Sequence, residues 1–102
     1  MKKNTSFRAY HLEKLTHKKH ARAYMQAALE AFQTEGDKDA FLLALRDIAE
    51  AQGGLSMLSQ KTGLNRQNLY KALSARGNPR LDTIGSLLHG LGYKLSVESI
   101  QP

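Results

Sequence analysis

Apolar residues recur at helical spacing through most of the chain. Within residues 16–35 they lie alternately three positions and one position apart, the pattern of an amphipathic helix. Similar apolar stripes run through residues 37–52 and 81–91. Thr16 and Asp37 stand where the first two helices need N-caps. Glycines follow all three stripes, namely Gly36, Gly53, Gly54 and Gly92. Because a helix commonly ends at a glycine with positive φ, the pattern predicts three helices that each bury one face.

Two shorter helices are predicted between the second and third stripes. The sequence there, residues 55–74, is LSMLSQKTGLNRQNLYKALS. It predicts a first helix over 55–62, a turn at Gly63, and a second helix that Asn65 caps and that runs to Ser74. The predicted inward residues are Leu58, Leu64, Leu69, Ala72 and Leu73. This arrangement is typical of a helix-turn-helix.

The second helix of this motif carries a polar face. At about 100° per residue, one side presents Arg66, Gln67, Tyr70, Lys71 and Ser74. Arginine can pair bidentately with guanine and glutamine with adenine, while lysine, tyrosine and serine suit bases or phosphates. The alternative is an ordinary helical hairpin whose polar face is simply solvated.

The local charge favours DNA over that alternative. Residues 56–80 contain five basic residues and no acidic one: Lys61, Arg66, Lys71, Arg76 and Arg80. A solvated face would normally mix charges of both signs, whereas an unbalanced positive face attracts phosphate. Of these residues, we expect Lys61, Arg76 and Arg80 to contact the DNA backbone rather than to distinguish bases.

The two ends of the chain have different patterns. Residues 1–16 scatter their apolar side chains at no clear period, so we interpret them as a basic N-terminal arm outside a domain that spans 17–102. The chain has a net charge of +6, and residues 1–23 carry seven basic residues against Glu13 alone. Residues 93–98 alternate apolar and polar side chains, which predicts a half-buried β-strand. That strand would pair with a second copy or with a partner protein, and the alternative is an extended tail.

Composition excludes several classes of function. A chain of 102 residues without cysteine can form one domain but no disulfide or thiolate metal site. Neither a signal peptide nor an apolar run of membrane-spanning length is found in the sequence, so we expect a cytoplasmic protein with no membrane contact. His17 and His20 lack further ligand residues, and we predict no metal and no cofactor. We interpret the acidic residues Asp37, Asp39, Asp47 and Glu50 as caps and solvent-facing groups, and no nucleophile–base pair accompanies them, so we expect no enzyme.

Short motifs in the second half of the chain carry a family resemblance. They are LRDIA at residues 45–49, GG at 53–54, LYKALS at 69–74, GNP at 77–79 and LGYKLSVE at 91–98. In these motifs the chain resembles addiction-module antidote proteins, or antitoxins, of the Cro/lambda-repressor-like helix-turn-helix superfamily. The expected fold is all-α, a lambda-repressor-like helix-turn-helix bundle of about five helices with a short C-terminal β-strand.

The resemblance implies a bacterial or prophage protein that represses its own operator and is encoded beside a small basic toxin of the RelE type. It also implies DNA-reading positions at Asn65, Arg66, Gln67, Tyr70 and Lys71. The chain departs from the family at Ser59, where alanine is usual, and at Lys18 and Lys19, where acidic residues are usual. The complete set of predicted DNA-binding residues is Asn65, Arg66, Gln67, Tyr70, Lys71, Ser74, Lys61, Arg76 and Arg80.

One recognition helix makes few base contacts, so we expect a homodimer on double-stranded DNA. Two alternatives have different partners. One is a prophage-type transcriptional regulator without a toxin. The other is a toxin-binding interaction module with only non-specific affinity for DNA, in which the acidic stretch 30–50 would dock a basic toxin.

Overall fold

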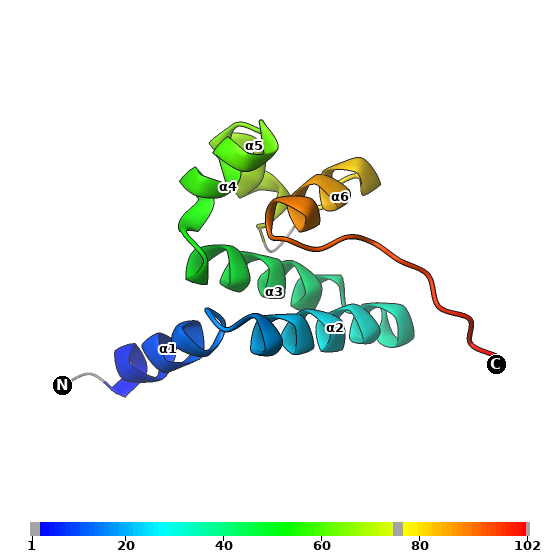
Figure 1. The fold of residues 1–102 in the computed structure, drawn as a ribbon, viewed down its shortest axis with the longest axis horizontal. Helices are drawn as coiled ribbons and strands as arrows, with labels where there is room; N and C mark the ends of the chain where they lie inside the picture. The colour runs from blue at the N-terminus through cyan, green and yellow to red at the C-terminus, as the bar shows by residue number, and fades with distance from the viewer. Residues whose placement is uncertain (1–2, 75–76, 102) are drawn as a thin grey trace.

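The protein is built from helices packed in layers. The computed structural model describes residues 3–74 and 77–101, and within them the chain forms six α-helices and no β-strand. The helices are α1 (Lys3–Lys14), α2 (Lys18–Glu35), α3 (Lys38–Ala51), α4 (Gly54–Thr62), α5 (Arg66–Ala72) and α6 (Leu81–Gly90). Figure 1 shows α3 between a layer of α1 and α2 on one side and a layer of α4, α5 and α6 on the other. The all-α prediction is confirmed, with one helix more than the five expected.

The additional helix is α1. The sequence predicts no regular structure for residues 1–16, because their apolar side chains follow no period. The structure instead holds this helix against α3 through polar contacts, which a hydrophobic pattern does not reveal. At its end Leu15 is buried, and the Gln52 side chain donates a hydrogen bond of 3.4 Å to the Leu15 carbonyl. Helix α2 then begins after His17 rather than after Thr16, whose hydroxyl donates to the Glu13 carbonyl.

The core is centred on α3. Its apolar side chains face both layers, since α2 covers one side and the later helices cover the other. The largest fully buried side chains are Leu42, Leu45, Ile48, Leu69, Leu73 and Leu87. They come from α3, from α5 and its C-cap, and from α6, so the two short helices are fixed to the body of the protein through the same core.

Helix ends follow the predicted local chemistry. Gly36 ends α2 with φ of 72°, and Asp37 caps α3 by accepting a hydrogen bond of 3.1 Å from the Ala40 N–H. Gly63 ends α4 with φ of 77°, a conformation in which a side chain would be strained. These turns set the direction of α3 relative to α2 and of α5 relative to α4.

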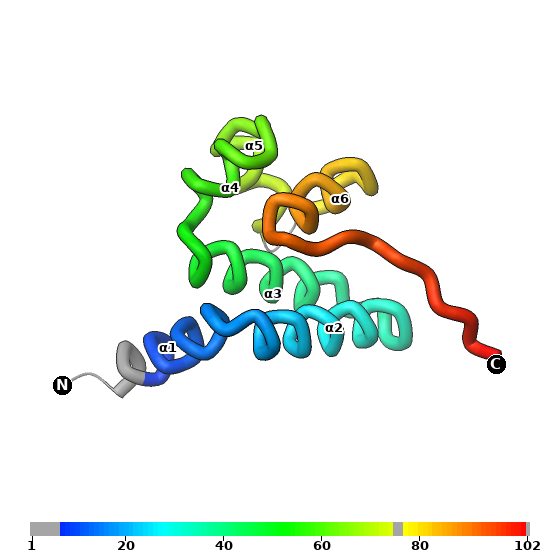
Figure 2. Tube along the Cα trace, in the orientation of Figure 1, coloured from blue at the N-terminus to red at the C-terminus, as the bar shows by residue number. Residues whose placement is uncertain are grey.

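The predicted C-terminal strand is not seen in the described part of the single chain. After α6, the Tyr93 N–H donates a hydrogen bond of 2.8 Å to the Leu88 carbonyl and the Tyr93 side chain is half-buried. Beyond Tyr93 the chain is extended and exposed to residue 101, and Figure 2 shows its end lying clear of the helices. A strand needs a neighbouring strand for its backbone hydrogen bonds, and the described part of one copy offers none.

Candidate nucleic-acid interface

Helices α4 and α5 are joined by a turn that side chains hold from within. The Ser59 hydroxyl on α4 donates a hydrogen bond of 2.6 Å to the Leu64 carbonyl. The Thr62 hydroxyl donates to the Leu58 carbonyl and accepts from the Leu64 N–H, at 2.8 and 3.2 Å. With Gly63 between them, these contacts fix the angle between the two helices. Ser59, at the position where the resemblance implies alanine, thus contributes to the turn.

Asn65 starts α5 as predicted. Its side-chain oxygen accepts a hydrogen bond of 2.8 Å from the Asn68 N–H, which satisfies one of the unpaired donors of the first turn. Because this oxygen is engaged in the cap, the side-chain amide nitrogen of Asn65 is the group best placed to contact an outside acceptor. The main role of Asn65 is therefore to start the helix, and its side chain can in addition donate a hydrogen bond.

The two sides of α5 differ as the helical spacing predicts. Leu69 and Leu73 are fully buried against the core. The opposite side is exposed and consists of Arg66, Gln67, Asn68, Tyr70 and Lys71. Asn68 was not among the predicted site residues, although its position in the first turn at the edge of the polar face could have indicated it. The helix thus presents a continuous row of hydrogen-bonding side chains to solvent.

Other predicted site residues lie apart from this row. Ser74 is half-buried, and its hydroxyl donates to the Lys71 carbonyl at 2.9 Å. Arg80 is exposed and forms an ion pair of 3.6 Å with Asp82, which partly balances its charge. Arg76 lies outside the described residues.

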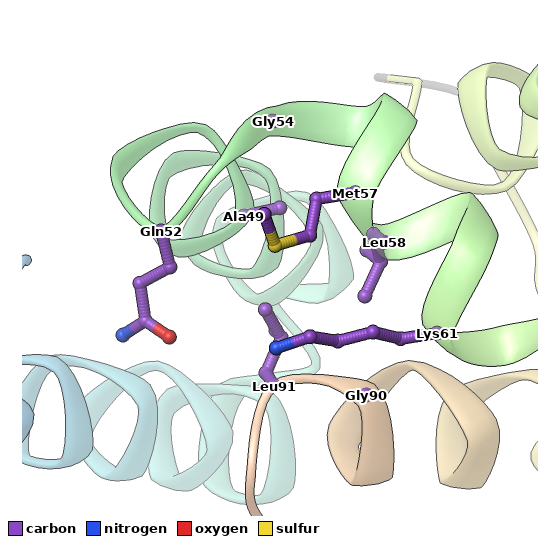
Figure 3. A pocket seen from close by; sticks show the side chains of 8 residues that line it. All are labelled: Ala49, Gln52, Gly54, Met57, Leu58, Lys61, Gly90 and Leu91. Atoms are coloured by element: carbon purple, nitrogen blue, oxygen red, sulfur yellow. The ribbon is translucent and has the colours of Figure 1, made fainter.

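Lys61 lies on the side of α4 that faces α6. Figure 3 shows a small hollow between these helices and the end of α3, lined by Ala49, Gln52, Gly54, Met57, Leu58, Lys61, Gly90 and Leu91. A Cβ atom at Gly90 would lie 2.8 Å from side-chain carbons of Leu58 and Thr62, so α6 approaches α4 closely. Lys61 is exposed, but it is not part of the row on α5.

Two further contacts fix the C-terminal end of α5. The Arg46 guanidinium on α3 donates a hydrogen bond to the Leu73 carbonyl. Gly77 is buried, and a Cβ atom there would lie 2.2 Å from the Ala72 carbonyl oxygen, so only glycine fits. The sequence indicates no role for Arg46, because it depends on how α3 packs against α5.

A buried carboxylate lies on the other side of α3. Asp47 is 2% exposed, which corrects its interpretation as a solvent-facing residue. Arg8 on α1 forms an ion pair of 3.1 Å with it, and the Tyr24 hydroxyl donates to it at 3.2 Å. His11 lies 3.3 Å from the same carboxylate, and Arg8 also reaches Glu50 at 2.8 Å. The side of α3 that carries Asp47 is therefore covered by α1 and α2.

This carboxylate changes the acidity of its neighbours. The hydrogen bond to Asp47 raises the pKa of Arg8 above its usual value. Burial raises the pKa of Tyr24 above its ordinary value of about 10, and the charge of Asp47 raises it further. Both shifts favour the protonated partners that hold the helices together.

The described residues contain no group of three or more histidine, aspartate or glutamate side chains that could hold a metal ion. His17 and His20 lie with their rings edge to face at 6.1 Å, and His11 instead contacts Asp47. Across the same residues, none of the helices combines the length and apolar character needed to cross a bilayer.

Comparison with known proteins identifies the family. Residues 6–99 match a family model described as "Probable addiction module antidote protein". An uncharacterized protein of Haemophilus influenzae is 33% identical over 86 residues, which is 84% of each chain. No solved structure matches this chain. On the length of the family match and the extent of this similarity, the chain belongs to the family of probable addiction module antidote proteins.

Proposed function

We propose that this antidote protein is the antitoxin of a toxin–antitoxin module and represses its own transcription by binding a specific DNA site. In this proposal α4 and α5 form a helix-turn-helix of the Cro/lambda-repressor-like kind, with α5 as the recognition helix. The protein acts by binding, not by catalysis. The observation that carries the proposal is the exposed row on α5, whose opposite side is buried in the core.

The chemistry of that row suits the edges of base pairs in the major groove. Arg66 can donate two hydrogen bonds to guanine, and Gln67 can both donate to and accept from adenine. Tyr70 and Lys71 are the next outward residues and can contact bases or phosphates. Because the Asn65 cap and the α4–α5 turn hold α5 in place, these side chains need little rearrangement on binding.

Backbone contacts would come from residues outside this row. Arg80 and Lys61 are exposed cations, and the side-chain amide nitrogen of Asn65 lies at the N-terminus of α5, where phosphate is favoured. Ser74 has a smaller part in this proposal, since its hydroxyl already donates within the helix. Two such units in a homodimer would contact half-sites about one DNA turn apart.

A gel-shift experiment tests the proposal. The purified protein is mixed with the DNA just upstream of its coding region, and random duplex of equal length competes at physiological salt. We expect a preference of about 10³-fold or more for the upstream DNA. Equal affinity for both duplexes would contradict specific binding and leave only the electrostatic attraction of a basic face for phosphate.

The surface proposed for the toxin lies at the junction of α2 and α3. Exposed acidic residues gather there, namely Glu30, Glu35, Asp37 and Asp39. Two apolar side chains, Phe32 and Leu43, are also partly open to solvent on these helices. A negatively charged surface with apolar side chains complements a small basic toxin, such as one of the RelE type.

Charge reversal tests this second surface. We expect a Glu35→Lys, Asp39→Lys double variant to lose affinity for the basic protein encoded next to it, with sedimentation as the measurement. DNA binding should be unchanged, which separates this surface from α5. If no such neighbour is encoded, the prophage-type regulator without a toxin becomes the better description.

A further inference from the structure

The C-terminal segment, residues 93–98, carries a pattern that the helices do not use. Tyr93 anchors it through its N–H and its half-buried ring. The backbone of residues 94–98 makes no hydrogen bond to the rest of the described chain. Leu95 is 45% exposed and Val97 is 97% exposed, although both are apolar. The segment is thus an extended edge whose backbone and apolar face lack a partner within the described part of one copy.

The sequence of this segment is complementary to itself when two copies run antiparallel about Ser96. Lys94 of one copy then faces Glu98 of the other, and Leu95 faces Val97. Ser96 faces Ser96, and the opposite charges and the apolar pairs each occur twice by symmetry. We propose that two copies of this chain pair through residues 94–98 as an antiparallel two-stranded ribbon centred on Ser96.

Other registers lose this complementarity. A shift of the centre by one residue, to Leu95 or to Val97, separates Lys94 from Glu98. A parallel pair in register would place each lysine opposite a lysine and each glutamate opposite a glutamate, which is unfavourable. Registers with odd offsets place polar residues opposite apolar ones, so their apolar face is lost. The register about Ser96 therefore satisfies both the charged and the apolar positions.

The position of Tyr93 agrees with this ribbon. Because side chains alternate along a strand, pairing would place Leu95 and Val97 on the same face as Tyr93, which packs against the core. The exposed Val97 would lie beside Leu95 of the second copy, so the ribbon covers apolar surface that a single copy leaves open. This inference deepens the homodimer of the proposed function and rests on that part of it, but it requires no DNA.

A cysteine pair tests the register directly, since the chain has no cysteine of its own. In Ser96→Cys, the two new thiols would face each other with Cα atoms about 4.5–5.5 Å apart, within the range of a disulfide. In the matched control Ser99→Cys, the two thiols would be about 20 Å apart along the ribbon. Under mild oxidation without DNA, we expect a covalent dimer from Ser96→Cys and not from Ser99→Cys. Equal cross-linking of both, or of neither, would overturn the proposed ribbon.

Charge exchange provides an independent test by sedimentation, again without DNA. We expect Lys94→Glu and Glu98→Lys each to weaken dimerisation about tenfold, because each places two like-charged pairs in the ribbon. The double variant should recover the original dissociation constant. No recovery, or a wild-type protein that stays monomeric at all concentrations, would contradict the proposal. Arg66→Ala should dimerise like the wild type, because Arg66 lies outside the ribbon. A wild-type protein that dimerises but shows no preference for the operator would count against DNA recognition and leave this ribbon unaffected.

Discussion

At the scale of single residues, Asp47 concentrates the interactions between the N-terminal helices and the core. A buried carboxylate is costly unless charged or hydrogen-bonding partners surround it, and here Arg8, His11 and Tyr24 do so. These partners come from α1 and α2, whereas Asp47 belongs to α3. One side chain therefore links three helices.

The first prediction concerns Tyr24 and pH. Its pKa is raised in the folded state. The contribution of the neutral phenol to the free energy of unfolding is therefore fully present below about pH 10 and is lost as the pH rises through the folded-state pKa. We expect the free energy of unfolding to fall more steeply between about pH 9 and 11 in the wild type than in Tyr24→Phe. Near neutral pH, Tyr24→Phe should itself cost about 1 kcal/mol through the lost hydrogen bond. Chemical denaturation measures both effects, and the exposed Tyr10→Phe serves as the control. A parallel pH dependence in Tyr24→Phe would contradict the assignment.

The second prediction separates base recognition from backbone contact. Arg66→Ala should cost about 1–3 kcal/mol on the operator and relax specificity at one base pair. Arg80→Ala should weaken binding to all sequences alike, because a phosphate contact carries no base information. Binding measured on operator and on random duplex distinguishes the two. An equal loss on both duplexes for Arg66→Ala would exclude it from base recognition.

At the scale of elements, the connection from α5 to α6 depends on close backbone packing. Gly77 has no room for a Cβ atom, because the carbonyl oxygen that it would meet belongs to the last residue of α5. Gly85 lies within α6, where a Cβ atom would meet nothing within 4 Å. A side chain is therefore excluded at Gly77 and can be accommodated at Gly85.

Alanine substitution at these positions is the third prediction. We expect Gly77→Ala to destabilise the protein by about 1–3 kcal/mol or more, since the backbone that it meets cannot move aside cheaply. Gly85→Ala should stabilise it by about 0.5–1 kcal/mol, because alanine favours a helix over the unfolded chain. Thermal unfolding of the two variants measures the difference. The same sign of change in both variants would contradict this account.

Helix α1 is the element that should open most easily. Within the described residues, α3 is its main packing partner. Ion pairs and Leu15, the buried residue that follows the helix, hold it in place. The fourth prediction is that amide hydrogens of residues 8–14 exchange faster than those of residues 42–49. Arg8→Gln should accelerate exchange in α1 further, while Lys19→Gln, an exposed change on α2, should not. Equal protection of α1 and α3 in the wild type would refute this view.

At the scale of the whole molecule, charge is distributed unevenly over the fold. The basic residues of the exposed row lie on α5, and the acidic residues of the proposed toxin surface lie near the connection from α2 to α3. Figure 1 shows that α5 and this connection are on different sides of the molecule. Under the proposed function, this separation would let DNA and a basic toxin bind without competing for one surface.

The fifth prediction links the dimer to DNA. The slope of the logarithm of affinity against the logarithm of salt concentration is about −0.9 for each phosphate contacted. A dimer that contacts two half-sites should therefore show about twice the slope of the Lys94→Glu variant measured below its weakened dimer dissociation constant, where it is monomeric. Filter binding over a range of salt concentrations measures both slopes. Equal slopes would show that dimerisation adds no phosphate contacts.

The sequence predicts those features that depend on neighbours along the chain. Apolar spacing and glycines predict α2 to α6, and the cap at Asn65 with helical geometry predicts which side of α5 is exposed. Features that depend on contacts between residues far apart in the chain cannot be predicted from this pattern. Helix α1 is held by charges on another helix, Asp47 is buried because α3 is covered on two sides, and a strand at residues 93–98 requires a second strand.

The division of α5 into a buried and an exposed side has a consequence for how such proteins diversify. Leu69 and Leu73 support the fold, whereas Arg66, Gln67 and Tyr70 lie outside the core. Substitutions on the exposed side should cost little stability, typically within about 0.5 kcal/mol. If α5 reads an operator as proposed, new preferences can evolve on this helix without compensating changes elsewhere. Duplicated modules in one genome could then become insulated from each other by a few surface substitutions.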